Sequence, residues 1–170
     1  MRLQDLYYGA FFQDNLSLTD WVNSQPLTNP VICLGDGHDG LWNLFKEIVT
    51  TSQRQEILDW YHLKENLYKV GGSRKRPKVA EALLWRGRVE DAIAIFDNCH
   101  RRQVINFRAY LKKHRLGLVD YETCQELQPG SIGSGAVESA VKQIGRRLKF
   151  QARSGNLKVF LKCYNCVVPT

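Results

Sequence analysis

The sequence predicts an α/β fold in which a short strand-and-loop region is followed by a long series of helices. Residues 31–34 form an apolar run that gives way to glycines and aspartates over 35–40, which is typical of a buried strand ending in a tight loop. Residues 41–49 have apolar side chains at helical spacing, so 31–49 predicts a strand–loop–helix unit. From residue 74 to residue 127 the apolar residues recur at helical spacing with short breaks, which predicts a mostly helical region.

Proline and glycine residues divide the rest of the chain into short elements. Residues 1–30 mix aromatic and polar residues and end in a loop punctuated by Pro26 and Pro30. Residues 55–62 predict a second short strand, which runs into an amphipathic helix over 63–70 that ends at Gly71 and Gly72. We expect further helices over 77–85, 89–99 and 99–116, a loop over 129–135, and a last helix over 136–148.

The composition of the 170-residue chain excludes several protein classes. With 44% hydrophobic and 24% charged residues it has the balance of a soluble globular protein. No stretch approaches the roughly 18 apolar residues of a spanning helix, and the first residues lack the features of a signal peptide. The five cysteines are therefore expected to be reduced thiols, and we expect a cytoplasmic protein without membrane contact.

The positive charge is concentrated in particular places. The formal net charge is +7, but the last acidic residue is Glu138, and residues 1–138 hold 17 basic and 17 acidic residues. The whole excess therefore comes from the seven basic residues after Glu138. Such local patches favour contact with a polyanion at defined sites.

Two acidic residues are candidates for chemistry. Asp36 comes where the apolar strand ends, between Gly35 and Gly37, and a carboxylate held there by a rigid element can meet a metal ion. Asp-Gly is also a common turn dipeptide, so a purely structural turn is the alternative. Glu138 falls in the first turn of the last predicted helix, where it either complements the helix dipole or binds metal beside the basic residues that follow.

Other motifs have a functional and a structural interpretation. Asp59 and His62 are three residues apart, and a histidine beside Trp60 and Tyr61 is more often a packed, hydrogen-bonded core residue than a ligand. Two basic segments are either solvated faces or nucleic-acid contacts, and they contain Arg74, Lys75, Arg76, Arg101 and Arg102. Cys163 and Cys166 have the spacing of half a zinc site, but no second pair completes it, so chance explains them better.

Three segments in this order carry a resemblance: VICLGDGHDGLWNLF, EILDWYHLKENLYKV and SIGSGAVESAVKQIGRR. Together they resemble the C-terminal half of bacterial insertion-sequence transposases, specifically the Kra-type family related to Mutator-like transposases. The resemblance implies a partial ribonuclease H-like catalytic fold with a mostly α-helical insertion domain. By it, residues 1–62 are a partial core, 63–128 the helical insertion, 129–150 the C-terminal catalytic helix, and 151–170 a frameshifted tail.

The resemblance also assigns roles to residues. Asp36 matches the second Asp of an Asp-Asp-Glu triad and Glu138 matches the Glu, with 101 residues between them. Asp59 and His62 match an Asp-x-x-His pair near the start of the insertion. Carboxylates of this kind hold the Mg²⁺ ions that stabilise charge on the oxygens of a cleaved phosphodiester. The predicted DNA contacts are Lys142, Arg146 and Arg147, together with the basic residues of the insertion.

The chain departs from the family pattern at both ends. The first Asp is expected on an earlier strand, and Asp5, Asp14 and Asp20 lie in no apolar run that predicts one. After Arg147 the expected Gly-Ala-Gln-Trp is missing, but back-translation of residues 151–170 in a shifted frame permits it. We therefore expect a frameshift near Phe150, and sequencing of the gene tests this directly.

The leading hypothesis is a truncated transposase fragment that binds insertion-sequence ends, has Mg²⁺ as its cofactor and is inactive alone. Self-association, or a second chain that supplies the missing N-terminal half, would complete it. One alternative is a stand-alone helical nucleic-acid-binding module without catalysis, and another is an unstable pseudogene product with exposed apolar faces.

Overall fold

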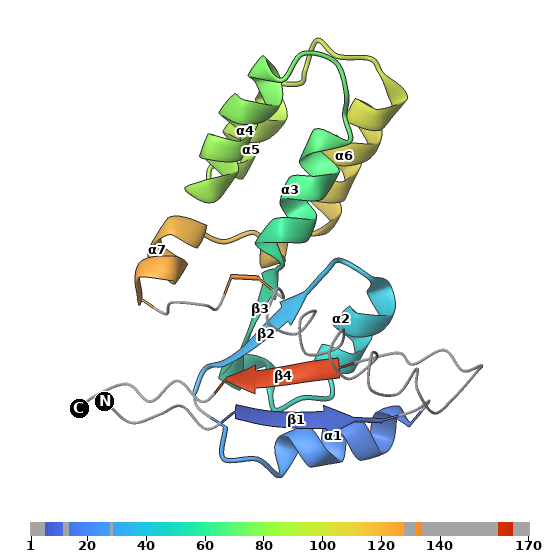
Figure 1. Cartoon of the computed structure of the whole chain (residues 1–170), viewed down its shortest axis with the longest axis vertical. Coiled ribbons are helices and arrows are strands. Elements are labelled where there is room, and N and C mark those ends of the chain that lie inside the picture. The colour runs from blue at the N-terminus through green and yellow to red at the C-terminus, as the bar shows by residue number, and fades with distance from the viewer. Residues whose placement is uncertain (1–5, 12–13, 28, 128–131, 134–159, 165–170) are drawn as a thin grey trace, which may run out of the picture. The chain divides into compact units, whose positions relative to one another are not determined.

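The computed structural model describes residues 6–11, 14–27, 29–127, 132–133 and 160–164. Short strands and helices alternate up to residue 58, and helices fill most of 60–127 (Figure 1). The strands are β1 (Leu6–Ala10), β2 (Val31–Gly35), β3 (Arg54–Leu58) and β4 (Phe160–Tyr164). The helices are α1 (Asn15–Asn23), α2 (Asp39–Phe45), α3 (Trp60–Tyr68), α4 (Lys75–Trp85), α5 (Val89–Ala94), α6 (Arg102–Lys113) and α7 (Tyr121–Leu127), with 3-10 turns at Thr51–Gln53 and Arg115–Gly117.

The predicted α/β character is confirmed, and β2 forms where the apolar run predicts a strand. β2 and β3 are hydrogen-bonded neighbours. The Asp59 main-chain N–H, just after β3, donates to the carbonyl of Gly35, the last residue of β2, over 2.7 Å. The carboxyl ends of the two strands therefore lie side by side, as in a parallel pair. Within the described part of the chain, no helix has the length and apolar character needed to cross a membrane.

The chain forms two compact units. The first comprises residues 1–33, 39–55 and 134–170, and the second comprises residues 34–38 and 56–133. In the first unit Asp14 caps α1, because its Oδ1 accepts from the Ser17 N–H over 3.0 Å. The buried core of this unit is apolar and consists of Leu18, Val22, Val31, Cys33, Leu44, Phe45 and Ile48.

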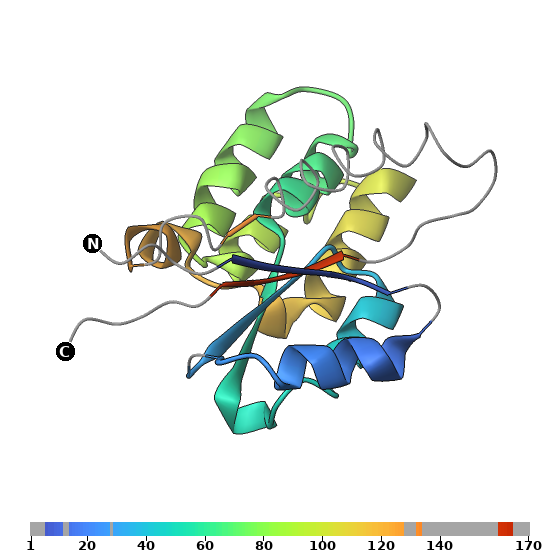
Figure 2. The same ribbon diagram turned by 60° about the horizontal axis from the view of Figure 1, so that its bottom comes forward.

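The first unit also contains a strand pair that the sequence does not predict. β1 and β4 are antiparallel, with Leu6 opposite Tyr164 and Ala10 opposite Phe160. Figure 2 shows the two strands side by side. β4 lies in the segment 151–170, for which the sequence suggests an out-of-frame origin. The paired strands come from opposite ends of the chain, so no local pattern could reveal the pair.

In the second unit the helices follow the predicted punctuation, with different ends. The break between α4 and α5 is at Gly87, which has a φ of 66° and lies against the Asp120 backbone. A Cβ atom there would be 3.2 Å from the Asp120 nitrogen, so the site requires glycine. α6 is shorter than the expected helix over 99–116, since it begins at Arg102 and ends at Lys113.

The prediction for residues 55–62 is wrong at its end. β3 stops at Leu58, and Trp60 already belongs to α3. The reason is Asp59, whose side chain accepts from the His62 N–H and so caps the helix. An Asp directly before an apolar residue is a signal for the start of a helix. Here the apolar residues Ile57 and Leu58 before Asp59 favoured a continuing strand instead.

Candidate functional site

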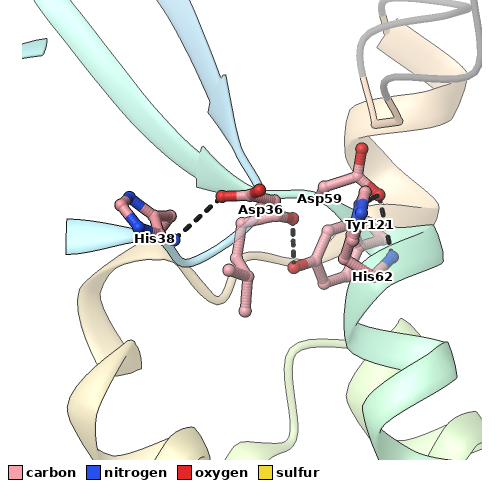
Figure 3. Close-up of polar contacts among 6 residues, drawn as sticks. Asp36, His38, Asp59, His62 and Tyr121 are labelled. Atoms are coloured by element: carbon pink, nitrogen blue, oxygen red, sulfur yellow. Dashed lines mark hydrogen bonds and ion pairs between the residues drawn. The ribbon is translucent and has the colours of Figure 1, made fainter. Parts of the chain in front are cut away.

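The candidate site lies at the carboxyl ends of β2 and β3. Asp36 follows β2 directly and Asp59 follows β3 directly, and the bond from the Asp59 nitrogen to the Gly35 carbonyl brings the two strand ends together. Figure 3 shows both carboxylates at this edge. Ligand sites of parallel sheets form at such carboxyl ends, because the following loops converge there. We call this region, with Tyr110 and Tyr121 described below, the strand-end site.

Asp36 is exposed and forms a turn. Its Oδ1 accepts a hydrogen bond from the His38 N–H over 2.8 Å (Figure 3). This is an Asx-type turn, which mimics a backbone turn and fixes the direction of the carboxylate. The structural interpretation of the Asp-Gly dipeptide therefore applies. The turn also leaves the side chain accessible to a ligand, so the functional interpretation stays a prediction.

Gly37 allows this turn to lie close to α6. Its φ is 96°, a conformation that L-residues rarely adopt. A Cβ atom on Gly37 would be 3.2 Å from Tyr110 Cε2 and 3.3 Å from His114 Nε2. The glycine thus has two functions, because it supplies the positive φ and lets the Asp36 turn pack against the end of α6.

Asp59 is fully buried, with 0% of its surface exposed. Its Oδ1 accepts from the His62 main-chain N–H over 3.0 Å, and His62 Nδ1 lies 3.4 Å from the same oxygen. That distance permits an ion pair when the imidazole is protonated but is too long for a strong hydrogen bond. The His62 side chain is 34% exposed and that of Asp59 only 1%, so of this pair it is His62 that a ligand can touch.

Tyr121 is a buried residue that contacts the end of β3. Its side chain is 0% exposed, and its hydroxyl donates to the Leu58 carbonyl at the end of β3 over 2.8 Å. The ring packs against Trp60 with 4.9 Å between centroids, and Trp60 packs against Trp85 at the same distance. Burial raises the pKa of the Tyr121 hydroxyl, so it remains a donor. The contact connects the strand end to α3, α4 and α7.

Tyr110 lies beside both aspartates. The pKa of its hydroxyl is raised to about 12. Burial is the largest cause, the charges of Asp36 and Asp59 also raise the pKa, and the Asn66 side chain lowers it. The hydroxyl therefore stays protonated at neutral pH. The strand-end site thus combines an exposed carboxylate, a partly exposed histidine and a protonated phenol on one edge of the unit.

The sequence did not single out Tyr110, His114 or Tyr121. They come 74, 78 and 85 positions after Asp36. In the sequence, the segment with Tyr110 and His114 shows only the apolar periodicity of a helix. Tyr121 sits in α7, which carries no motif. The available signal was the presence of tyrosines among the apolar residues of these segments, since a buried Tyr normally needs a partner for its hydroxyl.

The predicted basic residues of the insertion lie at the opposite end of α3. All five are exposed, namely Arg74, Lys75, Arg76, Arg101 and Arg102. α3 runs from Trp60 to Tyr68 between this site and Gly71, a length of roughly 14 Å at 1.5 Å per residue. The structure therefore does not bring these cations to Asp36. The predicted basic residues and the predicted residues Asp36, Asp59 and His62 lie at different places in the same unit.

The remaining predicted residues lie outside the described part of the chain. These are Glu138 and the bases Lys142, Arg146 and Arg147. Among the described residues, no group of three or more His, Cys, Asp or Glu side chains is placed to hold a metal ion. Asp36 nevertheless has the chemistry that Mg²⁺ requires, because this ion keeps several waters and takes one or two carboxylates.

Comparison of the chain with protein-family models, with curated proteins and with solved structures found no match.

Proposed function

We propose that this chain is a fragment of a metal-dependent DNA strand-cleavage and strand-transfer enzyme of the insertion-sequence transposase type, inactive by itself. The observation that carries the proposal is the placement of Asp36 at the shared carboxyl end of two parallel strands. The Asp59 to His62 turn at the neighbouring strand end, followed by the helices of residues 60–127, agrees with the order of parts that the sequence resemblance implies.

In this proposal Asp36 supplies one carboxylate to Mg²⁺ and Glu138 supplies a second. The metal, when bound, would stabilise negative charge on the oxygens of the phosphodiester. Asp36 is oriented by the His38 N–H, and Asp59 holds the start of α3 so that His62 faces outward. Tyr110 keeps its proton, and its ring lies against the turn that Asp36 forms.

Two acids make an incomplete site for a two-metal reaction, in which the attacking and the leaving oxygen are stabilised together. The proposal therefore predicts metal and DNA binding by the isolated chain, with strand cleavage only when a second chain supplies the missing acid. This is the sense in which the fragment is inactive alone.

The test measures binding of a labelled DNA duplex by the full chain, with and without Mg²⁺. We expect Mg²⁺ to tighten binding, and we expect Asp36→Ala combined with Glu138→Ala to remove that gain. Asp39→Ala is the matched control, because it removes one equal charge three residues from Asp36. A gain that survives the double substitution, or that Asp39→Ala removes equally, would contradict the proposal.

The second candidate function is a helical nucleic-acid-binding module without catalysis. The observation that favours it is that all five basic residues at the far end of α3 from Asp36 are exposed, namely Arg74, Lys75, Arg76, Arg101 and Arg102. This candidate predicts DNA binding that weakens steeply with salt and is indifferent to Mg²⁺ and to both acid substitutions.

A further inference from the structure

A pocket of about 620 Å³ lies where the loop after α3 meets the loop before α6. Its volume falls in the range of roughly 300–1,000 Å³ that small-molecule sites occupy. The first loop contributes Gly72, Lys75 and Arg76, and the second contributes His100 and Arg101. Figure 1 shows the two loops at the same end of the helices. We call this region the basic pocket.

The described lining of the basic pocket is cationic and contains no carboxylate. Lys75, Arg76 and Arg101 have no acidic partner among the described residues. Five other cations of the same unit have acidic partners, among them Lys64 with Glu81, Arg108 with Asp97 and Arg115 with Glu90, at 2.7, 2.8 and 2.8 Å. The positive charge of the pocket is therefore left without an internal counter-charge.

The helix ends add to this imbalance. The amino end of a helix favours negative charge, and α5 and α7 have acids in their first turns, including Glu90 and Glu122. α4 and α6 have none, and they begin with cations instead, at Lys75 and Arg102. An anion in the pocket would offset unfavourable electrostatics at both helix ends as well as the charge of the side chains.

The floor of the pocket is apolar. Val70, Phe96 and Val104 line it and are buried. Arg76 contacts the Cys99 side chain across the pocket, and Arg101 lies over Gly72, where a Cβ atom would be 2.5 Å from Nη1. The ligand that matches such a site has an anionic group for the rim and a less polar part for the floor. A nucleotide has both, as a phosphate and a sugar with its base.

We propose that the basic pocket binds one nucleotide through its phosphate, with Lys75, Arg76 and Arg101 as the phosphate ligands. Arg102 and Arg74 are adjacent in sequence but do not line the pocket, so they are not part of the site. The five basic residues thus divide into three that bind and two that do not. The proposal goes beyond the proposed function, since it requires neither Mg²⁺ nor Asp36. The same chemistry is offered by a free nucleotide and by one unit of a nucleic-acid strand.

The test titrates the full chain with thymidine 5′-monophosphate and with a ten-nucleotide oligothymidine, by calorimetry and by fluorescence anisotropy. Arg101→Gln and Lys75→Gln remove pocket charges, and Lys78→Gln and Lys112→Gln, at exposed positions that do not line the pocket, are matched controls with the same loss of charge. Because charge-assisted hydrogen bonds to phosphate are strong, we expect the first pair to weaken binding at least about ten-fold and the controls less than about two-fold. Far-UV circular dichroism of each variant verifies its fold.

The results separate the two sources of the ligand. Pocket-specific loss with both probes, or with the oligonucleotide alone, supports the pocket as a site for a nucleic-acid strand. Pocket-specific loss with the mononucleotide, and no binding of the oligonucleotide, supports the pocket while contradicting the DNA binding in the proposed function. Equal losses in all four variants, or no binding of either probe, would overturn the pocket proposal.

Discussion

The strand-end site and the basic pocket occupy opposite ends of the same two helices and are built in opposite ways. α3 begins just after Asp59 and ends before the pocket. α6 begins at the pocket, and its last turn with the cap residue His114 places Tyr110 and His114 beside the Asp36 turn. At the strand ends Asp59 and Tyr121 are fully buried and hydrogen-bonded to their neighbours, whereas Asp36 is exposed. At the pocket the cations are exposed and have no acidic partner within the described residues.

This difference teaches which property each region controls. A buried group with internal partners contributes to folding, and its removal leaves a cavity or an unsatisfied atom. An exposed cation without a partner contributes little to folding, so its interaction energy is available for a ligand. Substitutions of Asp59 and Tyr121, the buried residues of the strand-end site, should therefore lower stability, and substitutions at the basic pocket should lower binding with stability unchanged.

The largest effect is expected for Tyr121→Ala. It removes a fully buried ring that packs on Trp60 and Trp85, so we expect a loss of about 3–5 kcal/mol in the free energy of unfolding. Tyr121→Phe keeps the ring and loses only the bond to the Leu58 carbonyl, for which we expect about 1 kcal/mol. Urea denaturation measures both. Losses of equal size would show that the hydroxyl, not the packing, matters.

Alkaline pH should produce the next largest effect, through Tyr110. Its pKa is raised from 10.0 to about 12, so the folded chain holds a proton that the unfolded chain releases. The stability from this group is complete below about pH 10 and is lost as pH rises toward 12. Tyr110→Phe should show a smaller loss between pH 9 and pH 11.5 in urea denaturation. Parallel curves for the two proteins would refute the assigned shift.

Substitution of Asp59 should have a moderate effect. Asp59→Ala removes the cap of α3, and we expect a loss of about 1–2 kcal/mol. Asn caps helices as well as Asp, so Asp59→Asn should restore most of the stability. A thermal melt of both variants tests this. If Asp59→Asn is as unstable as Asp59→Ala, the charge beside His62 matters more than the cap.

The smallest effect on stability is expected at the basic pocket. Arg101→Gln and Lys75→Gln should change the free energy of unfolding by no more than about 0.5 kcal/mol, because both side chains are exposed and lack an acidic partner in the described structure. A loss above about 1 kcal/mol in the same urea experiment would remove the contrast between the two regions.

The sequence predicted the parts of the fold that local patterns control. β2 follows from its apolar run, and the break between α3 and α4 follows from Gly71 and Gly72, whose φ values are 68° and 80°. It missed the β1–β4 pair, since antiparallel pairing across most of the chain depends on tertiary contacts. It also placed the start of α3 too late, because a single cap at Asp59 outweighed the apolar residues before it.

The candidate site was predictable only in part. Asp36, Asp59 and His62 were found from local spacing, and the structure places all three at the strand ends. Tyr110 and Tyr121 were not, because their positions beside the aspartates arise from helix packing. The basic residues were found as two separate segments, and only the fold shows that Lys75, Arg76 and Arg101 line one pocket whereas Arg74 and Arg102 do not.

The most direct test of the central claim is Mn²⁺ binding by the full chain, since Mn²⁺ takes the same oxygen ligands as Mg²⁺ and its free ion is counted by electron paramagnetic resonance. We predict that the chain binds Mn²⁺, that Asp36→Asn weakens this binding at least about ten-fold, and that Asp39→Asn leaves it unchanged. Binding that is identical in the wild type and Asp36→Asn, or no binding at all, would contradict Asp36 as a metal ligand.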